Sequence, residues 1–560
     1  MAGMKPFGII KEKYLQLDGK NSFHVNFKNM NKEYFCVMDI YPMISPIHPQ
    51  RHPGWFRFDI VKDGDYEFVF RQKENEYFIE SLDGLDTIDK WQSSNLDVNI
   101  LPASVRIVIR KKINNEIVFE DKIICYTNQH EYLEQEEYFA SVEKSIEDLP
   151  LVTPIIPRKL SIKIVLKSFV DGDAIGYFVW ETYALLKKMG IETEIYSQTC
   201  EDKFRPFIHS ITELLTDDKQ ITKDTVILYN YSICDDYLDD LLDLSCKKIA
   251  YFHGITDPKS IRVFDAELAQ ECQQGLDMLY KIKGFDRIIV NSQKTGNILY
   301  KHICENEFRE ETRKGRLRSM RALSSINENS QMLKAKKIVF QKIMVLPPVI
   351  ISESVWRHIS SDGQFFKSIE KIGDVLLYVG RMYPHKRVEE IVAVFKEILT
   401  QNQNAILLLI GGTHNSYQKY LQHRINELPK AMQERIVSIP QVSRNQLKAA
   451  YEGANAFITM SEDEGFCVPI LEAMRFKLPV FARKHDNSAA DELLDGTGKL
   501  ICNKDYESIA SEINHVFMDQ EYREKIIAEQ NTRVKNYEDN KLMKKFLNIL
   551  LGCYYDENFN

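Results

Sequence analysis

From about residue 158 onward, short apolar runs alternate with helix-like segments, and this alternation constrains the fold more than any other feature of the sequence. KIVLKSF is followed by YFVWETYALLKKMG, whose helical pattern ends at Gly190, and IETEIYS, TVILYNY and KKIAYFHG follow in turn. Apolar strands that alternate with helices predict a parallel sheet with helices packed on its faces. We therefore expect an α/β fold over most of the chain.

The alternation occurs twice. The first set closes near IMVLPPVI, and a second set begins at DVLLYVG and continues through AILLLIGG, AFITMSE and LPVFAR. This predicts two Rossmann-like lobes, residues 158–350 and 370–530, which face a cleft and hold a ligand at the carboxyl ends of their strands. Residues 531–560 are expected to form a helical tail.

Residues 1–150 have a different pattern. Segments such as FHVNF, EYFCVMDIY and WFRFDIV are rich in aromatic and β-branched residues and are separated by turn signals, which predicts a β-rich, sandwich-like accessory domain. The acidic stretch 131–147 predicts a trailing helix, and the prolines after it predict a linker. Glycan binding through exposed aromatics, docking or oligomer formation, and a plain structural cap all stay open for this domain.

Composition narrows the class of protein. The 560 residues are 44% hydrophobic and carry a net charge of −8, which disfavours both disorder and a dedicated nucleic-acid binder. The N-terminus lacks the apolar run of a signal peptide, and no stretch approaches the ~20 apolar residues of a membrane span. The ten cysteines include no C-x-x-C pair, so no zinc site is expected. We expect a cytoplasmic protein that binds no nucleic acid.

A basic tract, residues 308–337, interrupts the end of the first lobe. It holds nine Lys or Arg residues, which could lie on anionic lipid at the inner face of the membrane or contact an acceptor diphosphate. A solvated helical insertion with Glu partners explains the same charges. Both interpretations stay open.

The stretch SEDEGFCVPILEAMRFK carries the strongest chemical signal. It follows an apolar strand, and Pro469 suits the first turn of a helix, whose N-terminal N–H groups favour a diphosphate. The stretch resembles the Glu-x7-Glu signature of the retaining glycosyltransferase family 4, with Glu464 and Glu472 as the two carboxylates and Gly465 and Phe466 in the expected places. The resemblance implies that Glu472 holds a ribose and that Glu464 positions the donor sugar.

A second segment, LLYVGRMYPHKR, supplies the positive charge. Arg381 and Lys386 flank a Pro-containing turn after a strand, where Arg can clamp phosphate oxygens and Lys adds a compact charge. This segment is also similar to family 4, and the similarity implies that both cations bind the donor diphosphate and stabilise it as a leaving group.

Four further residues follow from the same resemblance. Gly172 and Asp173 lie in a loop after the first strand, where family members hold donor phosphates and sugar, and Gly411 lies in the loop after AILLLI. The sequence around Gly411 differs from that of the usual glycine loop, so recognition of the nucleotide base stays open. His253 ends a strand and corresponds to a histidine beside the anomeric carbon; a strand-capping histidine satisfied by backbone is the alternative.

The resemblance covers residues 160–530 and implies a GT-B fold and transfer of a sugar, with retention, from a UDP- or GDP-sugar to a glycan or lipid-linked glycan. It implies no cofactor. Asp171-Gly172-Asp173 has the D-x-D form of metal-dependent transferases, but Asp63-Gly64-Asp65 shows how easily that form arises in a turn, and we expect no metal.

Two rival functions remain at this stage. A nucleotide-sugar epimerase would also use two Rossmann-like units, although the Glu-x7-Glu context disfavours it. A non-catalytic glycan-binding or assembly module on a transferase-like body is the more distinct alternative, and the intact Arg, Lys and Glu positions count against it.

Overall fold

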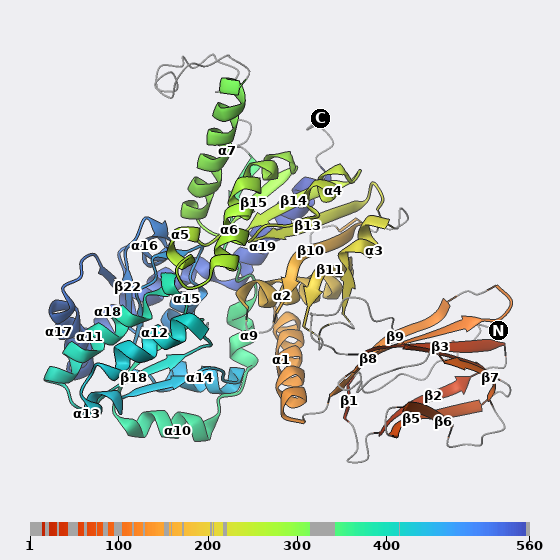
Figure 1. Ribbon diagram of the computed structural model, residues 1–560, viewed down its shortest axis with the longest axis horizontal. Coiled ribbons are helices and arrows are strands. Elements are labelled where there is room, and N and C mark those ends of the chain that lie inside the picture. Colours follow the sequence, from red (N-terminus) through yellow and green to blue (C-terminus); the bar gives the residue numbers. More distant parts are fainter. Residues whose placement is uncertain are drawn as a thin grey trace. The chain divides into compact units, whose positions relative to one another are not determined.

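Figure 1 shows the computed structural model, which divides into two compact units. One unit comprises residues 1–137, 168–171 and 194–213, and the other comprises 138–167, 172–193 and 214–560. The structure describes residues 14–16, 22–30, 33–42, 54–60, 64–73, 76–81, 88–93, 103–114, 117–126, 129–149, 156–157, 159–170, 173–201, 204, 207–216, 221–313, 342–413 and 415–555.

The first unit is built mainly of antiparallel strands. One sheet has the order β1-β9-β8-β3-β4-β7 and another has the order β2-β5-β6. The strands are β1 (Tyr14–Gln16), β2 (Ser22–Met30), β3 (Tyr34–Pro42), β4 (Gly54–Ile60), β5 (Gly64–Lys73), β6 (Glu76–Ser81), β7 (Ile88–Ser93), β8 (Ala103–Lys111) and β9 (Ile117–Tyr126). The β-rich N-terminal region that the sequence predicts is confirmed.

Strand β1 is the exception to the antiparallel pattern, because it pairs in parallel with β9. A parallel pair needs a long connection, and the rest of the β-rich region lies between these two strands in sequence. The same unit also includes most of β11 (Glu192–Cys200), the whole of β12 (Ile208–Ser210), which pairs with β11 in parallel, and the first half of α3 (Ile211–Thr216). The predicted trailing helix is α1 (Gln129–Asp148), which continues into the second unit.

The second unit contains a parallel sheet in which β10, β13, β14, β15 and β16 follow one another. Their bounds are β10 (Ser161–Phe169), β13 (Thr225–Tyr231), β14 (Lys247–Phe252), β15 (Arg287–Val290) and β16 (Ile343–Val345). Every residue of β13 is buried, as expected for a central strand that is covered on both faces. The helices that accompany these strands are α2 (Ala174–Lys188), α4 (Leu238–Asp243), α5 (Pro258–Ile261), α6 (Ala266–Met278) and α7 (Gln293–Arg313), with the 3-10 helix η3 (Leu279–Gly284).

A second parallel sheet in the same unit has the order β19-β18-β17-β20-β22-β24, the doubly wound order of a Rossmann-like lobe. The strands are β17 (Asp374–Val379), β18 (Ala405–Ile410), β19 (Ile436–Ile439), β20 (Ala456–Thr459), β22 (Val480–Arg483) and β24 (Lys499–Ile501). The helices are α9 (Ser352–His358), α10 (Gly363–Ile372), α11 (Val388–Gln401), α12 (Asn415–Asn426), α13 (Lys430–Gln433), α14 (Arg444–Gly453), α15 (Val468–Arg475), α16 (Ala490–Leu494), α17 (Tyr506–Met518) and α18 (Gln520–Val534).

The core of this lobe lies between the sheet and helices α11 and α17, where Leu407, Phe395 and Ile513 are fully buried. After the 3-10 turn η6 (Lys535–Tyr537), helix α19 (Asp539–Tyr555) returns to the first parallel sheet, where the Tyr554 hydroxyl donates to Asp224 at 2.7 Å. The two lobes are therefore linked twice, once through the segment after β16 and once through α19 (Figure 1).

The fold class predicted from the sequence is confirmed, since both parallel Rossmann-like sheets and the β-rich N-terminal region are present. Helix α2 is followed by Gly190 at a φ of +77°, the left-handed conformation that ends a helix. The exact domain boundaries stay predictions. Most of the basic tract 308–337 and the proline-rich linker lie outside the described residues. In the part of the chain that the structure describes, no helix is long and apolar enough to span a membrane.

Candidate active site

The turn after β17 carries the two predicted cations. Gly380 adopts a φ of +148°, and the chain then passes through Arg381 to the 3-10 turn η5 (Pro384–Lys386). Arg387 follows in the left-handed conformation, with a φ of 52°, and its guanidinium donates to Glu390 at 2.7 Å. Because a non-glycine residue is strained there, this ion pair helps to hold the turn that presents Lys386.

Lys386 is paired with a predicted site carboxylate. Its Nζ lies 2.6 Å from Oε1 of Glu464, and only 19% and 14% of the two side chains are exposed. Glu464 belongs to β21 (Asp463–Glu464), which pairs with β23 (Asn487–Ser488), and its carbonyl accepts from the Ala489 N–H at 3.1 Å. The fold thus brings together two residues that are 78 positions apart and fixes the carboxylate from both its backbone and its side chain.

Arg381 reaches the other lobe. Its guanidinium lies 3.1 Å from Oδ1 of Asp173, and 63% of the arginine side chain is exposed. Asp173 is the N-cap residue of α2, although its side chain makes no capping hydrogen bond. Gly172, which the sequence places beside it, lies outside the described residues. Among the described residues, Asp173 of this D-x-D-like segment pairs with the guanidinium of Arg381.

The lobes are in close contact at Gly465. A Cβ atom added there would lie 2.3 Å from the carbonyl oxygen of His253, so only glycine fits. The Thr295 hydroxyl donates to the Gly465 carbonyl at 3.0 Å, and the Asp257 N–H donates to Asp463 at 2.6 Å. Burial raises the pKa of Asp463 to about 6, against the opposing effect of the Asp257 N–H. The segment that the sequence marks as Glu-Gly-Phe is thus also a contact between lobes.

His253 directly follows β14 and is buried, with 7% of its surface exposed. Its ring stacks on Tyr251 at 4.4 Å, and its Nε2 lies 2.9 Å from Oδ1 of Asn230. Burial lowers its pKa to about 3, against a smaller opposing effect of Asn291. The imidazole is therefore neutral at ordinary pH, and the backbone carbonyl of the same residue makes the contact with Gly465. The predicted place of His253 beside the anomeric carbon stays a prediction.

Helix α15 holds the remaining predicted positions. Its N-cap residue Cys467 is left-handed at a φ of 65° and gives no side-chain cap, and Phe466 before it is buried against the Tyr537 ring at 5.7 Å. The carboxylate of Glu472 accepts hydrogen bonds from Trp356 Nε1 at 3.1 Å and from the Tyr451 hydroxyl at 2.8 Å. A carboxylate has about four acceptor positions, so capacity for a ribose hydroxyl remains.

Gly411 directly follows β18 and adopts a φ of +137°. A Cβ atom there would lie 2.1 Å from the Gly380 carbonyl oxygen, so the glycine allows the loop after β18 to lie against the loop after β17. Met382 continues this contact, because its N–H donates to the Gly412 carbonyl at 2.7 Å. The glycine loop and the cationic turn form one surface at the carboxyl ends of two neighbouring strands.

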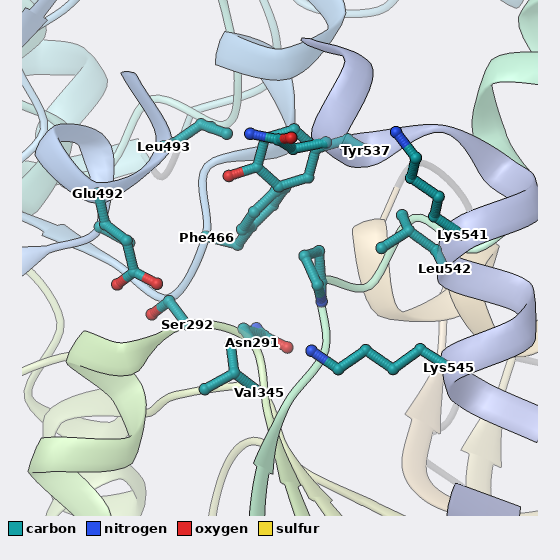
Figure 2. A pocket seen from close by; sticks show the side chains of 13 residues that line it. Asn291, Ser292, Val345, Phe466, Glu492, Leu493, Tyr537, Lys541, Leu542 and Lys545 are labelled. Carbon is teal, nitrogen blue, oxygen red and sulfur yellow. The ribbon is translucent and has the colours of Figure 1, made fainter. Parts of the chain in front are cut away.

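A cavity of about 240 Å³ is lined in part by Phe466. Figure 2 shows Asn291, Ser292 and Lys545 on one wall and Phe466 and Tyr537 on the opposite one. Ligand pockets in proteins usually measure about 300–1,000 Å³. The cavity is therefore too small to enclose a nucleotide sugar, which is expected on the side of the cationic turn.

Several neighbours of the site carried no sequence signal. Arg444, at the start of α14, lies over the Tyr177 ring at 3.7 Å and the Tyr138 ring at 4.3 Å. Glu492 accepts the free N–H groups of Gln293 and Lys294 at the start of α7, at 2.8 and 3.2 Å. These residues join elements that are far apart in sequence, and no local spacing could have indicated them.

Known proteins share part of this chain's sequence and fold. Residues 362–533 match the family described as glycosyl transferases group 1. These residues are similar to a group 1 glycosyl transferase domain. Arg381, Lys386, Gly411 and the Glu464–Glu472 segment all lie inside the domain, whereas Asp173 and His253 come from the lobe before it.

Curated relatives share part of this chain. The capsular polysaccharide biosynthesis glycosyltransferase CapM of Staphylococcus aureus is 27% identical over 187 residues, 33% of this chain and 47% of its own length. The O-antigen chain mannosyltransferase RfbU of Salmonella typhimurium is 31% identical over 131 residues, 23% of this chain and 35% of its own length. The chain thus spans about half or less of the relatives that it matches. The predicted resemblance to bacterial cell-surface polysaccharide glycosyltransferases is confirmed.

The structural likeness to known proteins extends beyond residues 362–533. The N-terminal domain of the trehalose-6-phosphate phosphatase of Candida albicans aligns over 72% of this chain and 98% of its own, with a TM-score of 0.50 and 12% identity. At this identity the likeness concerns the fold alone. It includes more of this chain than the family match does.

Proposed function

We propose that the protein is a retaining glycosyltransferase that moves a sugar from a UDP- or GDP-sugar to a hydroxyl of a glycan or lipid-linked glycan during synthesis of a cell-surface polysaccharide. The observation that carries this proposal is the 2.6 Å pair between Lys386 and Glu464, which adjoins the contact of Gly465 with His253. A cation for phosphate and a carboxylate for sugar hydroxyls thus lie beside a buried neutral imidazole.

The donor diphosphate gathers negative charge as the glycosidic bond breaks. Because Glu464 already holds Lys386 in place, little reorganisation free energy is needed to position its charge when the leaving group forms. Arg381 is mostly exposed and exchanges Asp173 for phosphate oxygens, to which a guanidinium binds in a bidentate manner. The two cations act on the same leaving group, one from a fixed position and one from a mobile side chain.

The sugar and the nucleoside are assigned to the other predicted residues. Glu464 holds sugar hydroxyls, the role that the family resemblance implies, while Lys386 orients its carboxylate. Glu472 accepts a ribose hydroxyl beside its hydrogen bonds to Trp356 and Tyr451. Gly411 and the Gly172–Asp173 loop allow the chain to approach the donor closely, and Phe466 supports the Gly465 segment from behind.

The proposed reaction needs no metal ion and no cofactor. Two cations already face the diphosphate, which is the charge that Mg²⁺ or Mn²⁺ neutralises in metal-dependent transferases. Transfer activity that survives an excess of chelator is the expected result, and activity restored only by added divalent metal would contradict this part of the proposal.

Contact with the membrane and self-association belong to the same proposal. The basic tract 308–337 would meet anionic lipid at the inner membrane face, where a lipid-linked acceptor is presented. Flotation of the full chain with anionic and neutral vesicles tests the contact, and light scattering tests whether the β-rich N-terminal region supports an oligomer.

The decisive experiment is a panel of UDP- and GDP-sugars. A bound donor should raise the melting temperature of the protein, and the same donor should be hydrolysed slowly in the absence of acceptor. The variant Glu472→Ala should lose both effects. Trp356→Phe is the matched control, because it removes the Nε1–H donor and leaves the carboxylate in place. No shift and no turnover with any nucleotide sugar would favour a non-catalytic glycan-binding module.

A further inference from the structure

The amide of Asn230 has a fixed orientation. Asn230 lies in β13 and is 3% exposed, and its Nδ2 donates to the carbonyl of Val165 at 3.3 Å and to that of Leu228 at 3.5 Å. Carbonyl oxygens only accept hydrogen bonds, so the amide nitrogen must face them. The amide oxygen therefore faces the opposite way, toward Nε2 of His253 at 2.9 Å.

This orientation decides which ring nitrogen of His253 carries the proton. The ring stacks on Tyr251, meets the edge of Phe178 at 5.6 Å, and is neutral because burial lowers its pKa to about 3. A neutral imidazole has one N–H, and an amide oxygen can only accept. The proton is therefore on Nε2, and Nδ1 presents a lone pair.

Asn291 is a second amide that interacts with His253. Asn291 donates its Nδ2 to the His253 carbonyl at 2.9 Å, and its Oδ1 is enclosed without a hydrogen-bond partner among the described residues. The Asn291 side chain also interacts with the ring and raises the pKa of His253, although burial outweighs this effect. Nδ1 is the acceptor that the Nε2–H tautomer leaves on the ring.

We propose that Asn230 is a positioning residue that fixes His253 as the Nε2–H tautomer, so that Nδ1 accepts a hydrogen bond from a hydroxyl of the donor sugar beside Gly465. The inference rests on the proposed function for the identity of the ligand, and on the structure alone for the tautomer. A strand residue thereby sets the hydrogen-bonding character of a side chain in the next strand of the sheet, because β13 and β14 are direct neighbours.

The variant Asn230→Asp tests the role in transfer. The groups that face the ring are Tyr251, Phe178, Asn291 and residue 230 itself, and the new carboxylate beside Nε2 should raise the pKa of His253 into the assayed range. The protonated ring donates from both nitrogens and cannot accept from a hydroxyl. We expect kcat to fall roughly ten- to a hundredfold at low pH and to recover as pH rises through the new pKa, whereas the wild type shows no such ionisation.

The double variant Asn230→Asp with His253→Gln is the control. It should have low activity with no added pH dependence, because the titrating ring is gone. A pH profile of Asn230→Asp that superimposes on the wild-type profile would overturn the inference.

The tautomer can also be measured directly on the full-length wild type, without any assay of transfer. Selective ¹⁵N labelling of histidine, with His253 assigned by its loss in His253→Gln, distinguishes a protonated ring nitrogen from a bare one in the NMR spectrum. A protonated Nε2 and a bare Nδ1 are expected. The reverse pattern refutes the assignment whether or not a sugar donor is found, whereas the expected pattern in a protein that turns over no donor would contradict the proposed function alone.

Discussion

The two predicted cations of the site lie five residues apart in sequence, yet they are held in different ways. Lys386 pairs with Glu464 at 2.6 Å with both side chains largely buried, and both residues belong to the second parallel lobe, which contains β17 to β24. Arg381 pairs with Asp173 of the other lobe at 3.1 Å, and 63% of its side chain is exposed. A buried pair within one lobe is part of the scaffold, whereas an exposed pair between lobes is easily exchanged for a ligand.

The largest effect is expected from Lys386→Ala. The variant removes the fixed cation and leaves Glu464 partly buried without its partner, so kcat/KM should fall about 10²- to 10³-fold, and the free energy of unfolding should fall by about 2 kcal/mol. Steady-state kinetics and denaturant unfolding measure the two effects. The double variant Lys386→Ala with Glu464→Gln should regain stability but not activity. If neither variant changes the free energy of unfolding, the ion pair does not stabilise the fold.

Arg381→Ala should separate activity from stability. The exposed pair contributes little to folding, so the free energy of unfolding should change by less than about 0.5 kcal/mol. Loss of the guanidinium from the leaving group should still lower kcat by about 10²-fold. Arg381→Lys is the matched control, since it keeps the charge without the planar fork and should recover only part of the rate. A loss of stability as large as that of Lys386→Ala would remove the contrast between the pairs.

Asp173→Asn tests whether the exposed pair competes with the donor. If Asp173 only holds Arg381 until a diphosphate arrives, the variant frees the guanidinium and should lower KM for the donor by about two- to fivefold, since an exposed pair contributes up to about 1 kcal/mol. Donor titrations by calorimetry and kinetics measure this change. A higher KM would instead mean that the Asp173 carboxylate binds the donor itself.

A pH-dependent effect on stability is expected from Asp463, the neighbour of Glu464. Burial raises its pKa to about 6, so its contribution to stability is fully present below the ordinary carboxyl pKa near 3.8 and is lost as pH rises through about 6. Asp463→Asn keeps an oxygen that accepts the Asp257 N–H but removes the charge. The variant should match the wild type near pH 4 and exceed its unfolding free energy by up to about 3 kcal/mol at pH 7, because each pKa unit corresponds to about 1.4 kcal/mol. Denaturant unfolding at both values checks this, and equal stabilities at pH 7 would contradict the prediction.

Much of the fold was predictable because each signal was local. The run TVILYNY coincides with β13, and DVLLYVG and AILLLIGG contain β17 and β18. Apolar periodicity, Gly190 after α2 and Pro469 in the first turn of α15 depend only on neighbouring residues. The parallel pairing of β1 with β9 was not predictable, because it joins segments about 110 residues apart and neither carries a turn signal.

The candidate site divides in the same way. Motif spacing indicated four site residues, namely Arg381, Lys386, Glu464 and Glu472. It could not indicate that Lys386 would form an ion pair with Glu464. Nor could it indicate that Trp356 and Tyr451 would occupy the Glu472 carboxylate, since these donors come from other helices.

The sequence by itself determined the two parallel Rossmann-like lobes, the β-rich N-terminal region and the residue types that meet at the strand ends, because backbone conformation and amphipathic pattern are properties of short segments. Only the tertiary structure decided which charged side chains pair with one another. Lys386 is fixed by Glu464, Arg381 is left exchangeable on Asp173, and the proton of His253 is placed by Asn230. Coulombic and hydrogen-bonding energies depend on distances between atoms and on burial, and these quantities exist only once distant segments of the chain have packed together.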